Sequence, residues 1–297
     1  AIGYDNLPMH DIKLPIKESK KKSLEDSLKS YLVDNGFYEL INFPFVKQSY
    51  EDSISIDNPL DVNKGYFRKN LKNSLIEKLI YNEKRQKDCI KFFEISDLYS
   101  LEDNEVKKVR SIGIACSGRV GKNYENFSKK IDEAYLQKII EGFLDLDDSF
   151  KINLVSRKNY DSKNTSKIYY FESPLDILDN KILDYQAKSK TISEDIRYKK
   201  ISELPSSSRD LSFSISDPSM LNILEDTILN FKNEKLKETF VFDYFLNKKT
   251  SVTKIGFRFV FQCSNETIKD ADIDKIMQRI IQISKSIKTV TIPGLNI

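Results

Sequence analysis

The residues best suited to chemistry lie on one short stretch near the end of the chain, where Lys254, Arg258 and Gln262 recur at every fourth position. The stretch 255–261 places Ile, Phe, Phe and Phe at alternate positions between them. Successive side chains of a strand point to opposite faces, so the apolar set would face a core and the polar set an open surface. Lysine and arginine bind phosphates, and glutamine can read a base edge. The pattern indicates either a plain solvated β-face or a surface that contacts RNA.

Cysteine and histidine, which supply nucleophiles, bases and zinc ligands, are few in this chain. The three cysteines, Cys89, Cys116 and Cys263, are far apart, and His10 is the single histidine. A structural zinc site needs about four nitrogen or sulfur ligands at short spacing, so this inventory excludes one. A Cys/His or Ser/His pair would have to use His10. We therefore predict no catalytic residue and no metal ligand in this chain, and the scattered thiols favour a reducing cytoplasm.

Glycine-rich loops that cradle phosphates are not found in the sequence. Neither G-x-x-x-x-G-K-[ST] nor G-x-G-x-x-G occurs, and the chain has only 9 glycines in 297 residues. The glycine pair in 118–121 is too short for such a loop, so we predict an ordinary turn there. Arg68 and Glu94 are predicted to be structural, because a buried arginine needs partners, which Glu94 or backbone carbonyls could supply.

The overall charge argues against non-specific nucleic-acid binding. Lysine and arginine number 48 against 45 acidic residues, which gives a net charge of +3. Contact with RNA would need a local patch or the help of another chain. The apolar runs are too short to span a bilayer, and no signal peptide opens the chain, so we expect no membrane contact. Because the chain starts at Ala1 in the middle of a motif, we expect it to be a fragment of a longer protein.

The elements that position the polar stretch form a regular order. The apolar patterns predict strands and helices alternating as strand, helix, strand, strand, helix, strand over residues 211–215, 221–229, 240–244, 255–261, 273–287 and 289–292. This is the ferredoxin-like βαββαβ unit, a four-stranded antiparallel sheet with helices on one face. The rings of Phe257, Phe259 and Phe261 would then lie under the helices.

The first two-thirds of the chain predict a mixed α+β fold. Ser23 and Asp26 resemble a capping box that opens a helix, and Asn35-Gly36 would end it. Further helices are predicted over 71–82 and 135–143, and strands over 37–45, 90–95 and 112–116. This order favours an antiparallel sheet with helices on one side. Residues 151–201 are polar and lysine-rich and predict no definite topology.

Several short motifs, taken in order, resemble the C-terminal half of the β subunits of bacterial phenylalanine–tRNA ligase. The matching segments cover most of the chain and are 2–8, 36–42, 58–60, 67–71, 82–85, 93–95, 205–211, 254–262, 267 and 270–273. Each motif is short, but their shared order makes the resemblance specific. Two stretches depart from the family pattern: 151–201 lacks its histidine motifs, and 291–297 does not end in leucine-arginine.

The resemblance implies an architecture and a role. Residues 1–20 would be a lead-in from an upstream module, 21–200 a class II synthetase-like core without catalysis, and 203–297 a ferredoxin-fold anticodon-binding domain. The chain would bind the tRNA for phenylalanine and pack on a catalytic α subunit in an (αβ)₂ heterotetramer. ATP and magnesium would be bound in the α subunit and upstream of Ala1, not by this segment.

The same resemblance makes five residues candidates for contact with tRNA: Arg209, Tyr244, Lys254, Arg258 and Gln262. Two other interpretations stay open. One is a stand-alone RNA-binding protein of the RNA-recognition-motif type, which would carry the rings of 255–261 on the open face of its sheet. The other is an independent enzyme with a site inside residues 1–200.

Overall fold

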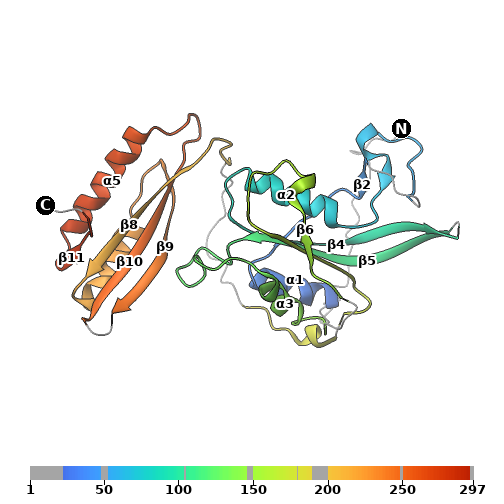
Figure 1. Cartoon of the computed structure of the whole chain (residues 1–297), viewed down its shortest axis with the longest axis horizontal. Coiled ribbons are helices and arrows are strands. Elements are labelled where there is room, and N and C mark those ends of the chain that lie inside the picture. Colours follow the sequence, from blue (N-terminus) through green and yellow to red (C-terminus); the bar gives the residue numbers. More distant parts are fainter. Residues whose placement is uncertain are drawn as a thin grey trace, which may run out of the picture.

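The structure is a computed structural model that describes residues 23–47, 53–103, 105–145, 150–178, 180–188, 200–247 and 250–294. The predicted lead-in 1–20 lies outside these residues. The chain forms two α+β units that lie side by side (Figure 1). The first unit is built from 23–188 and the second from 200–294, each around its own apolar core.

A five-stranded sheet forms the centre of the first unit, with strand order β1-β4-β5-β7-β6. Its strands are β1 (Tyr38–Glu39), β4 (Cys89–Glu102), β5 (Glu105–Gly118), β6 (Asn153–Val155) and β7 (Ile168–Pro174). The long β4–β5 hairpin extends beyond the body of the unit (Figure 1). A small separate sheet pairs β2 (Phe45–Val46) with β3 (Tyr66–Phe67). The sequence predicted no definite topology for 151–201, and the structure shows that this segment forms β6 and β7 at one edge of the sheet.

Helices cover both faces of this sheet, which corrects the prediction that they would lie on one side. Leucines of α1 (Leu24–Asp34) and α3 (Glu133–Ile140) pack on the face that carries Phe93. Those of α2 (Lys72–Glu83) pack on the face that carries Phe92. Figure 1 shows α2 on one side of the sheet and α1 and α3 on the other. The second face accepts a helix because Gly113 has no side chain there: a Cβ on it would lie 2.8 Å from that of Leu71.

One strand pair also differs from the predicted antiparallel arrangement. β1 runs parallel to β4, with Tyr38 beside Phe92, while the other pairs of the sheet are antiparallel. A helix precedes β1 and the α2 segment follows it, so the chain crosses over before it returns in β4. Short 3₁₀ turns complete the unit: η2 (Val62–Lys64), η3 (Arg157–Asn159) and η4 (Asn180–Asp184).

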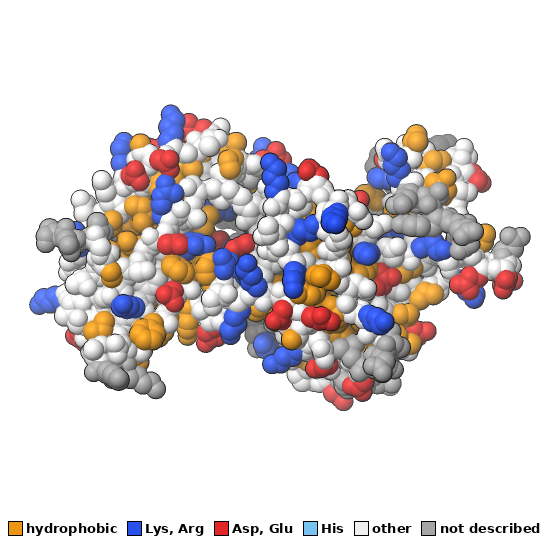
Figure 2. Space-filling view, in the orientation of Figure 1, with side chains coloured by type: hydrophobic (Ala, Val, Ile, Leu, Met, Phe, Trp, Pro, Cys, Tyr) orange, Lys and Arg blue, Asp and Glu red, His pale blue; other side chains and the backbone are white. Residues whose placement is uncertain are grey.

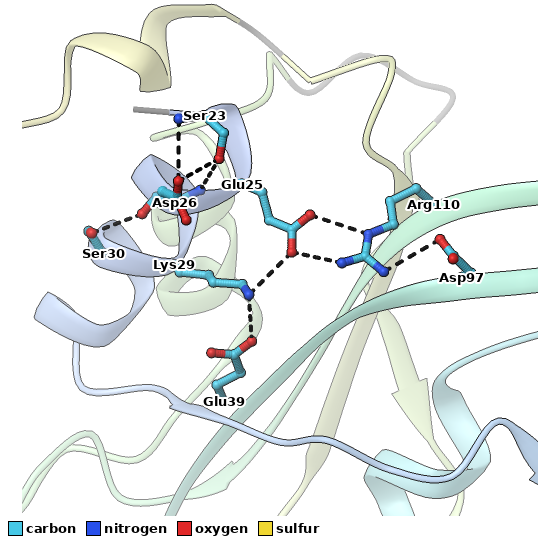
Figure 3. Close-up of polar contacts among 8 residues, drawn as sticks. All are labelled: Ser23, Glu25, Asp26, Lys29, Ser30, Glu39, Asp97 and Arg110. Atoms are coloured by element: carbon cyan, nitrogen blue, oxygen red, sulfur yellow. Dashed lines mark hydrogen bonds and ion pairs between the residues drawn. The ribbon is translucent and has the colours of Figure 1, made fainter. Parts of the chain in front are cut away.

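The predicted capping box of α1 is confirmed, and the same helix is held to the hairpin by ion pairs. Ser23 accepts a hydrogen bond from the backbone N–H of Asp26 at 3.1 Å. Glu25 pairs with Arg110 of β5 at 2.7 Å and with Lys29 of its own helix at 3.2 Å (Figure 3). Arg110 also reaches Asp97 of β4 at 3.4 Å, so one guanidinium joins the helix to both strands of the hairpin.

The second unit confirms the predicted ferredoxin-like order. Its strands are β8 (Ser207–Ile215), β9 (Leu236–Asn247), β10 (Val252–Phe261) and β11 (Val290–Thr291), arranged as β11-β8-β10-β9 and all antiparallel. The helices are α4 (Leu221–Leu229) and α5 (Asp270–Lys285), with the short turn η5 (Pro218–Met220) before α4. In the described part of the chain, every helix is too short or too polar to cross a bilayer.

The register of β10 is the one that its alternation predicts. Phe257, Phe259 and Phe261 are fully buried in the core under α4 and α5. Arg258 and Lys254 therefore project from the opposite face. This register contradicts the RNA-recognition-motif alternative, which needs those three rings on the open surface.

A β-bulge in β9 corrects the predicted alternation of its three rings. Gly256 lies opposite Asp243 and Phe257 opposite Val241, which leaves Phe242 as an extra residue. The rings of Phe240 and Phe242 consequently lie on the open face, whereas Tyr244 packs against the core on the helix side.

Candidate nucleic-acid interface

The open face of the second sheet carries the predicted contact residue that is most available to a ligand, Lys254. It is exposed on β10 and lies between Ser214 of β8 and Phe245 of β9 in the register of the sheet. The ring of Phe245 is 56% exposed. Among the residues that the structure describes, no carboxylate pairs with the Lys254 ammonium. A free cation beside an exposed ring is a combination that binds phosphate and stacks on a base.

Arg258 lies on the same face but is engaged within the chain. Its guanidinium donates two hydrogen bonds to the Asp210 carboxylate, at 2.7 and 2.6 Å. It also lies 4.7 Å from the ring centre of Phe127, a residue of the first unit. The cation is therefore a contact between the two units as well as a candidate for RNA.

The other three predicted residues also have partners inside the chain. Gln262 donates to the carbonyl of Leu204 and accepts from the Lys237 ammonium. Arg209 pairs with Asp270 at the start of α5 at 2.6 Å. The ring of Tyr244 lies 5.4 Å from that of Tyr124 in the first unit. Of the five predicted residues, Lys254 and Arg258 lie within β10 and project from its open face. Gln262 follows β10 and is bonded to the loop 202–206, whereas Arg209 lies on β8 and Tyr244 on β9.

The loop 119–130 of the first unit covers part of this open face. Phe127 is buried, and its ring centre lies 5.8 Å from that of Phe240 and 5.6 Å from that of Phe242. Lys122 of the same loop pairs with Glu238 of β9 at 2.8 Å. The sequence analysis predicted an ordinary turn at 118–121, where this segment begins, and assigned no role to the rest of it. The signal that could have revealed its role is the pair of aromatic residues in an otherwise polar loop.

A buried ion pair occupies the middle of the first unit. Arg68 and Glu94 lie 2.6 Å apart, and both side chains are 2% exposed. Glu94 also accepts a hydrogen bond from the amide of Asn42 at 2.8 Å, and Arg68 donates to Ser74 at 3.2 Å. These contacts confirm the prediction that Arg68 and Glu94 serve as structural partners.

An apolar cluster packs α2 on the sheet of the first unit. Leu71, just before α2, and Leu75 and Leu79 within it are fully buried in this cluster. Within the described ranges, no group of three or more His, Cys, Asp or Glu side chains is arranged to hold a metal ion.

Comparison with protein families gives two matches that divide the chain at the same place as its two units. Residues 7–168 match the phenylalanyl tRNA synthetase beta chain CLM domain, and 202–291 match the ferredoxin-fold anticodon binding domain. By these matches the first unit is a synthetase beta-chain domain and the second a ferredoxin-fold anticodon binding domain. The chain belongs to the family of phenylalanyl tRNA synthetase beta chains, as the resemblance of its motifs predicted.

Individual relatives agree with the family. The phenylalanine–tRNA ligase beta subunit of Buchnera aphidicola subsp. Schizaphis graminum is 24% identical over 330 residues, which cover 95% of this chain and 40% of the relative. That of Syntrophus aciditrophicus is 23% identical and covers 94% and 40%. The chain thus spans about 40% of the length of the curated relatives it matches.

Among solved structures, the pyrrolysyl tRNA synthetase of Desulfitobacterium hafniense aligns with a TM-score of 0.31 and 12% identity, over 89% of this chain and 68% of that one. This similarity is too low to define a shared fold.

Proposed function

We propose that this chain is a non-catalytic part of the β subunit of phenylalanine–tRNA ligase. It supports the ATP-dependent attachment of phenylalanine to its tRNA by holding the anticodon region and by packing on a catalytic α subunit. The observation that carries the proposal is the open face of a ferredoxin-fold sheet with a free cation, Lys254, beside an exposed ring, Phe245. The family match supplies the kind of RNA.

We assign a different role to each of the two units. We assign 21–200 to a class II synthetase-like core and 203–297 to the anticodon-binding domain. Arg68 of the core is held in a structural ion pair with Glu94 and is therefore not free to bind a substrate. We accordingly assign the activation of phenylalanine to the partner subunit. ATP and magnesium would be bound there and upstream of Ala1, and the reaction would take place in the cytoplasm.

The exposed half of the sheet is the proposed anticodon surface. Lys254 would bind a backbone phosphate while an unpaired base stacks on Phe245, a contact worth about 1–3 kcal/mol. Arg258 would add a second charge at the edge of the part that Phe127 covers. Arg209, Tyr244 and Gln262 would shape the surroundings of this surface through their contacts within the chain.

An exposed apolar patch in the first unit fits the proposed α subunit. The side chains of Ile41, Phe43, Leu60 and Val62, which we call the 41–62 patch, are all at least 70% exposed. They lie in the segment that includes β2 and η2. Exposed apolar side chains that gather in one segment are typical of a protein–protein contact. We assign it to the interface within an (αβ)₂ assembly.

The test uses the full β subunit that contains this sequence, assembled with its α subunit. In Lys254→Ala, the affinity for the tRNA for phenylalanine should fall about 5- to 10-fold, the effect of losing one charge-assisted phosphate contact. Activation of phenylalanine without tRNA should not change, because that chemistry lies in the partner. Arg258→Ala should behave in the same way.

Lys138→Ala, an exposed lysine of α3, is the matched control and should leave tRNA affinity at its original value. If neither Lys254→Ala nor Arg258→Ala changes tRNA affinity, the anticodon role is wrong. If this chain alone adenylates an amino acid, the non-catalytic role is wrong.

A further inference from the structure

A basic cleft lies between the two units, next to the proposed anticodon surface. Two cavities of about 250 and 530 Å³ are both lined by Arg85, Gln86, Lys87, Lys237 and Gln262, so they lie next to each other, and together we call them the interdomain cleft. The first unit contributes the end of α2 and the turn after it. The second unit contributes β9, β10 and the segment that leads into β8.

The residues that line this cleft include more basic than acidic side chains, in contrast to the nearly balanced charge of the whole chain. Its walls carry the three acidic residues Asp88, Glu203 and Glu238 and the six basic residues Lys84, Arg85, Lys87, Lys122, Lys237 and Arg258. The whole chain of 297 residues has a net charge of only +3. Figure 2 shows blue side chains gathered at the junction of the two units. A cleft lined mainly by one sign of charge concentrates ligands of the opposite sign.

Two of the lysines lack a carboxylate partner in the described part of the chain. Lys87 forms no ion pair there, and Lys237 donates to the neutral amide oxygen of Gln262. Burial and the neighbouring ammonium groups of Lys87 and Lys122 lower the pKa of Lys237. The ammonium groups of Lys87, Lys122 and Lys237 repel one another, and Glu238 offsets part of this repulsion through its pair with Lys122. An anion between the lysines would relieve the rest.

The turn at the base of the cleft is held in an uncommon conformation. Gln86 has a φ of 62°, in the left-handed region that non-glycine residues rarely adopt. Its side-chain oxygen accepts hydrogen bonds from the backbone N–H and the hydroxyl of Ser206, at 2.8 and 2.7 Å. This bond between the units fixes the turn that carries Arg85 and Lys87. Strain that is retained in this way is typical of binding sites.

One wall of the cleft also offers an aromatic surface. The guanidinium carbon of Arg85 lies 3.4 Å from the ring centre of Tyr81, and that ring is 51% exposed. Stacked arginine and tyrosine side chains bind the bases and sugars of single-stranded or splayed RNA. An acidic peptide would use the lysines but has no need of this stacked pair, so the lining favours a nucleic acid.

We propose that the interdomain cleft binds the phosphodiester backbone of the same RNA that contacts the open sheet, beyond the anticodon loop. This inference rests on the proposed function. β10 connects the two surfaces, since Lys254 lies on the open face and Gln262 lines the cleft eight residues further on. At about 3.3 Å per residue the two positions lie roughly 26 Å apart, a distance that several nucleotides can bridge past the loop 119–130, which covers the sheet between them. Contacts with phosphate in the cleft carry no sequence information.

The test is a double variant, Lys87→Gln with Lys237→Gln, in the full β subunit assembled with its α subunit. Two probes are used: a transcript of the tRNA for phenylalanine, and the same transcript with an altered anticodon loop. The dissociation constant of each is measured over a series of salt concentrations. We expect both to bind about 3- to 10-fold more weakly, by the same factor, and the slope of log affinity against log salt to fall by about 1.5.

The control variants separate this proposal from the anticodon role. Lys138→Gln should change neither the affinity nor the slope, while Phe245→Ala, which removes the ring on which an anticodon base would stack, should weaken binding of the unaltered transcript more than of the altered one. If the double variant binds both transcripts like the wild type while Phe245→Ala does not, the cleft proposal is wrong and the anticodon role survives. If the double variant loses the α subunit but keeps its tRNA affinity and slope, the cleft binds an acidic protein segment and the proposal is overturned.

Discussion

Arg68 and Glu94 illustrate how a single buried pair can decide the stability of the first unit. Both are almost inaccessible to water and lie 2.6 Å apart. Removing one partner leaves the other charge buried without compensation, which costs about 3–5 kcal/mol. We therefore expect Arg68→Ala to lower the free energy of unfolding by that amount, measured by urea denaturation.

Arg110→Ala is the matched control for this prediction. Arg110 also pairs with a glutamate, Glu25, but its side chain is 42% exposed. A solvated pair contributes about 0–1 kcal/mol. Equal losses in the two variants would show that burial of the Arg68–Glu94 pair is not what makes it important.

The buried carboxyl of Glu172 predicts a pH dependence. It accepts hydrogen bonds from the backbone N–H of Leu71 and from the Tyr170 hydroxyl, yet burial raises its pKa above the ordinary 4.5. The folded chain then holds this proton more tightly than the unfolded chain. Stability is therefore lost as the pH rises from 4.5 through the pKa of the folded state.

Glu172→Gln should remove this loss. Within that pH window, the free energy of unfolding of the wild type should fall relative to the variant by up to about 1.4 kcal/mol per pH unit. Above the window the difference should stay constant. Urea denaturation at a series of pH values measures it, and parallel curves for the two proteins from pH 4.5 upward would contradict the assignment.

At the scale of elements, the helices and the strand with strict alternation were predictable from the sequence. The capping box at Ser23 and the alternation in 255–261 are local patterns, and both appear in the structure as predicted. The bulge at Phe242 was not predictable, because it is defined by the pairing with β10, not by the residues of β9 alone. The second helix layer also depends on distant residues, since Gly113 must lie under α2.

Gly113 gives a direct test of the packing of α2. A Cβ there would lie 2.8 Å from Leu71 Cβ and 2.9 Å from Leu75 Cδ1. Gly113→Ala should force the helix away from the sheet and cost about 1–3 kcal/mol of stability. Gly65→Ala is the control, because its Cβ would meet only the Val62 carbonyl oxygen, at 3.9 Å. Thermal unfolding compares the two, and an unchanged midpoint for Gly113→Ala would refute the close packing.

At the scale of the whole molecule, the contact between the two units could not be predicted from the sequence. It joins Phe127 to Phe240 and Phe242, more than a hundred positions away, and no local pattern specifies such a partner. The same limit applies to the candidate site. Because Lys254 and Arg258 are basic and lie four positions apart, the sequence predicted a charged face. The hydrogen bond from Arg258 to Asp210 was not predictable, because it depends on the register of β8 with β10.

This contact predicts the effect of Phe127→Ala. Each aromatic pair contributes about 0.5–1.5 kcal/mol, so the loss of two should expose the covered half of the sheet more often. Amide hydrogen exchange in β9 should become about tenfold faster around Phe240. Phe245→Ala, which changes a ring on the uncovered half, is the control and should leave that exchange unaltered. Unchanged exchange in Phe127→Ala would show that the loop 119–130 does not hold the sheet.

The proposed role of the second unit depends on where the tRNA lies on this chain. The most direct measurement is photo-cross-linking of a tRNA for phenylalanine that carries 4-thiouridine in its anticodon loop to the assembled enzyme, with the linked peptides identified by mass spectrometry. We predict cross-links on the uncovered part of β9 and β10, around Phe245 and Lys254. Cross-links confined to 23–188, or none to this chain, would contradict the assignment of the second unit as the part that holds the tRNA.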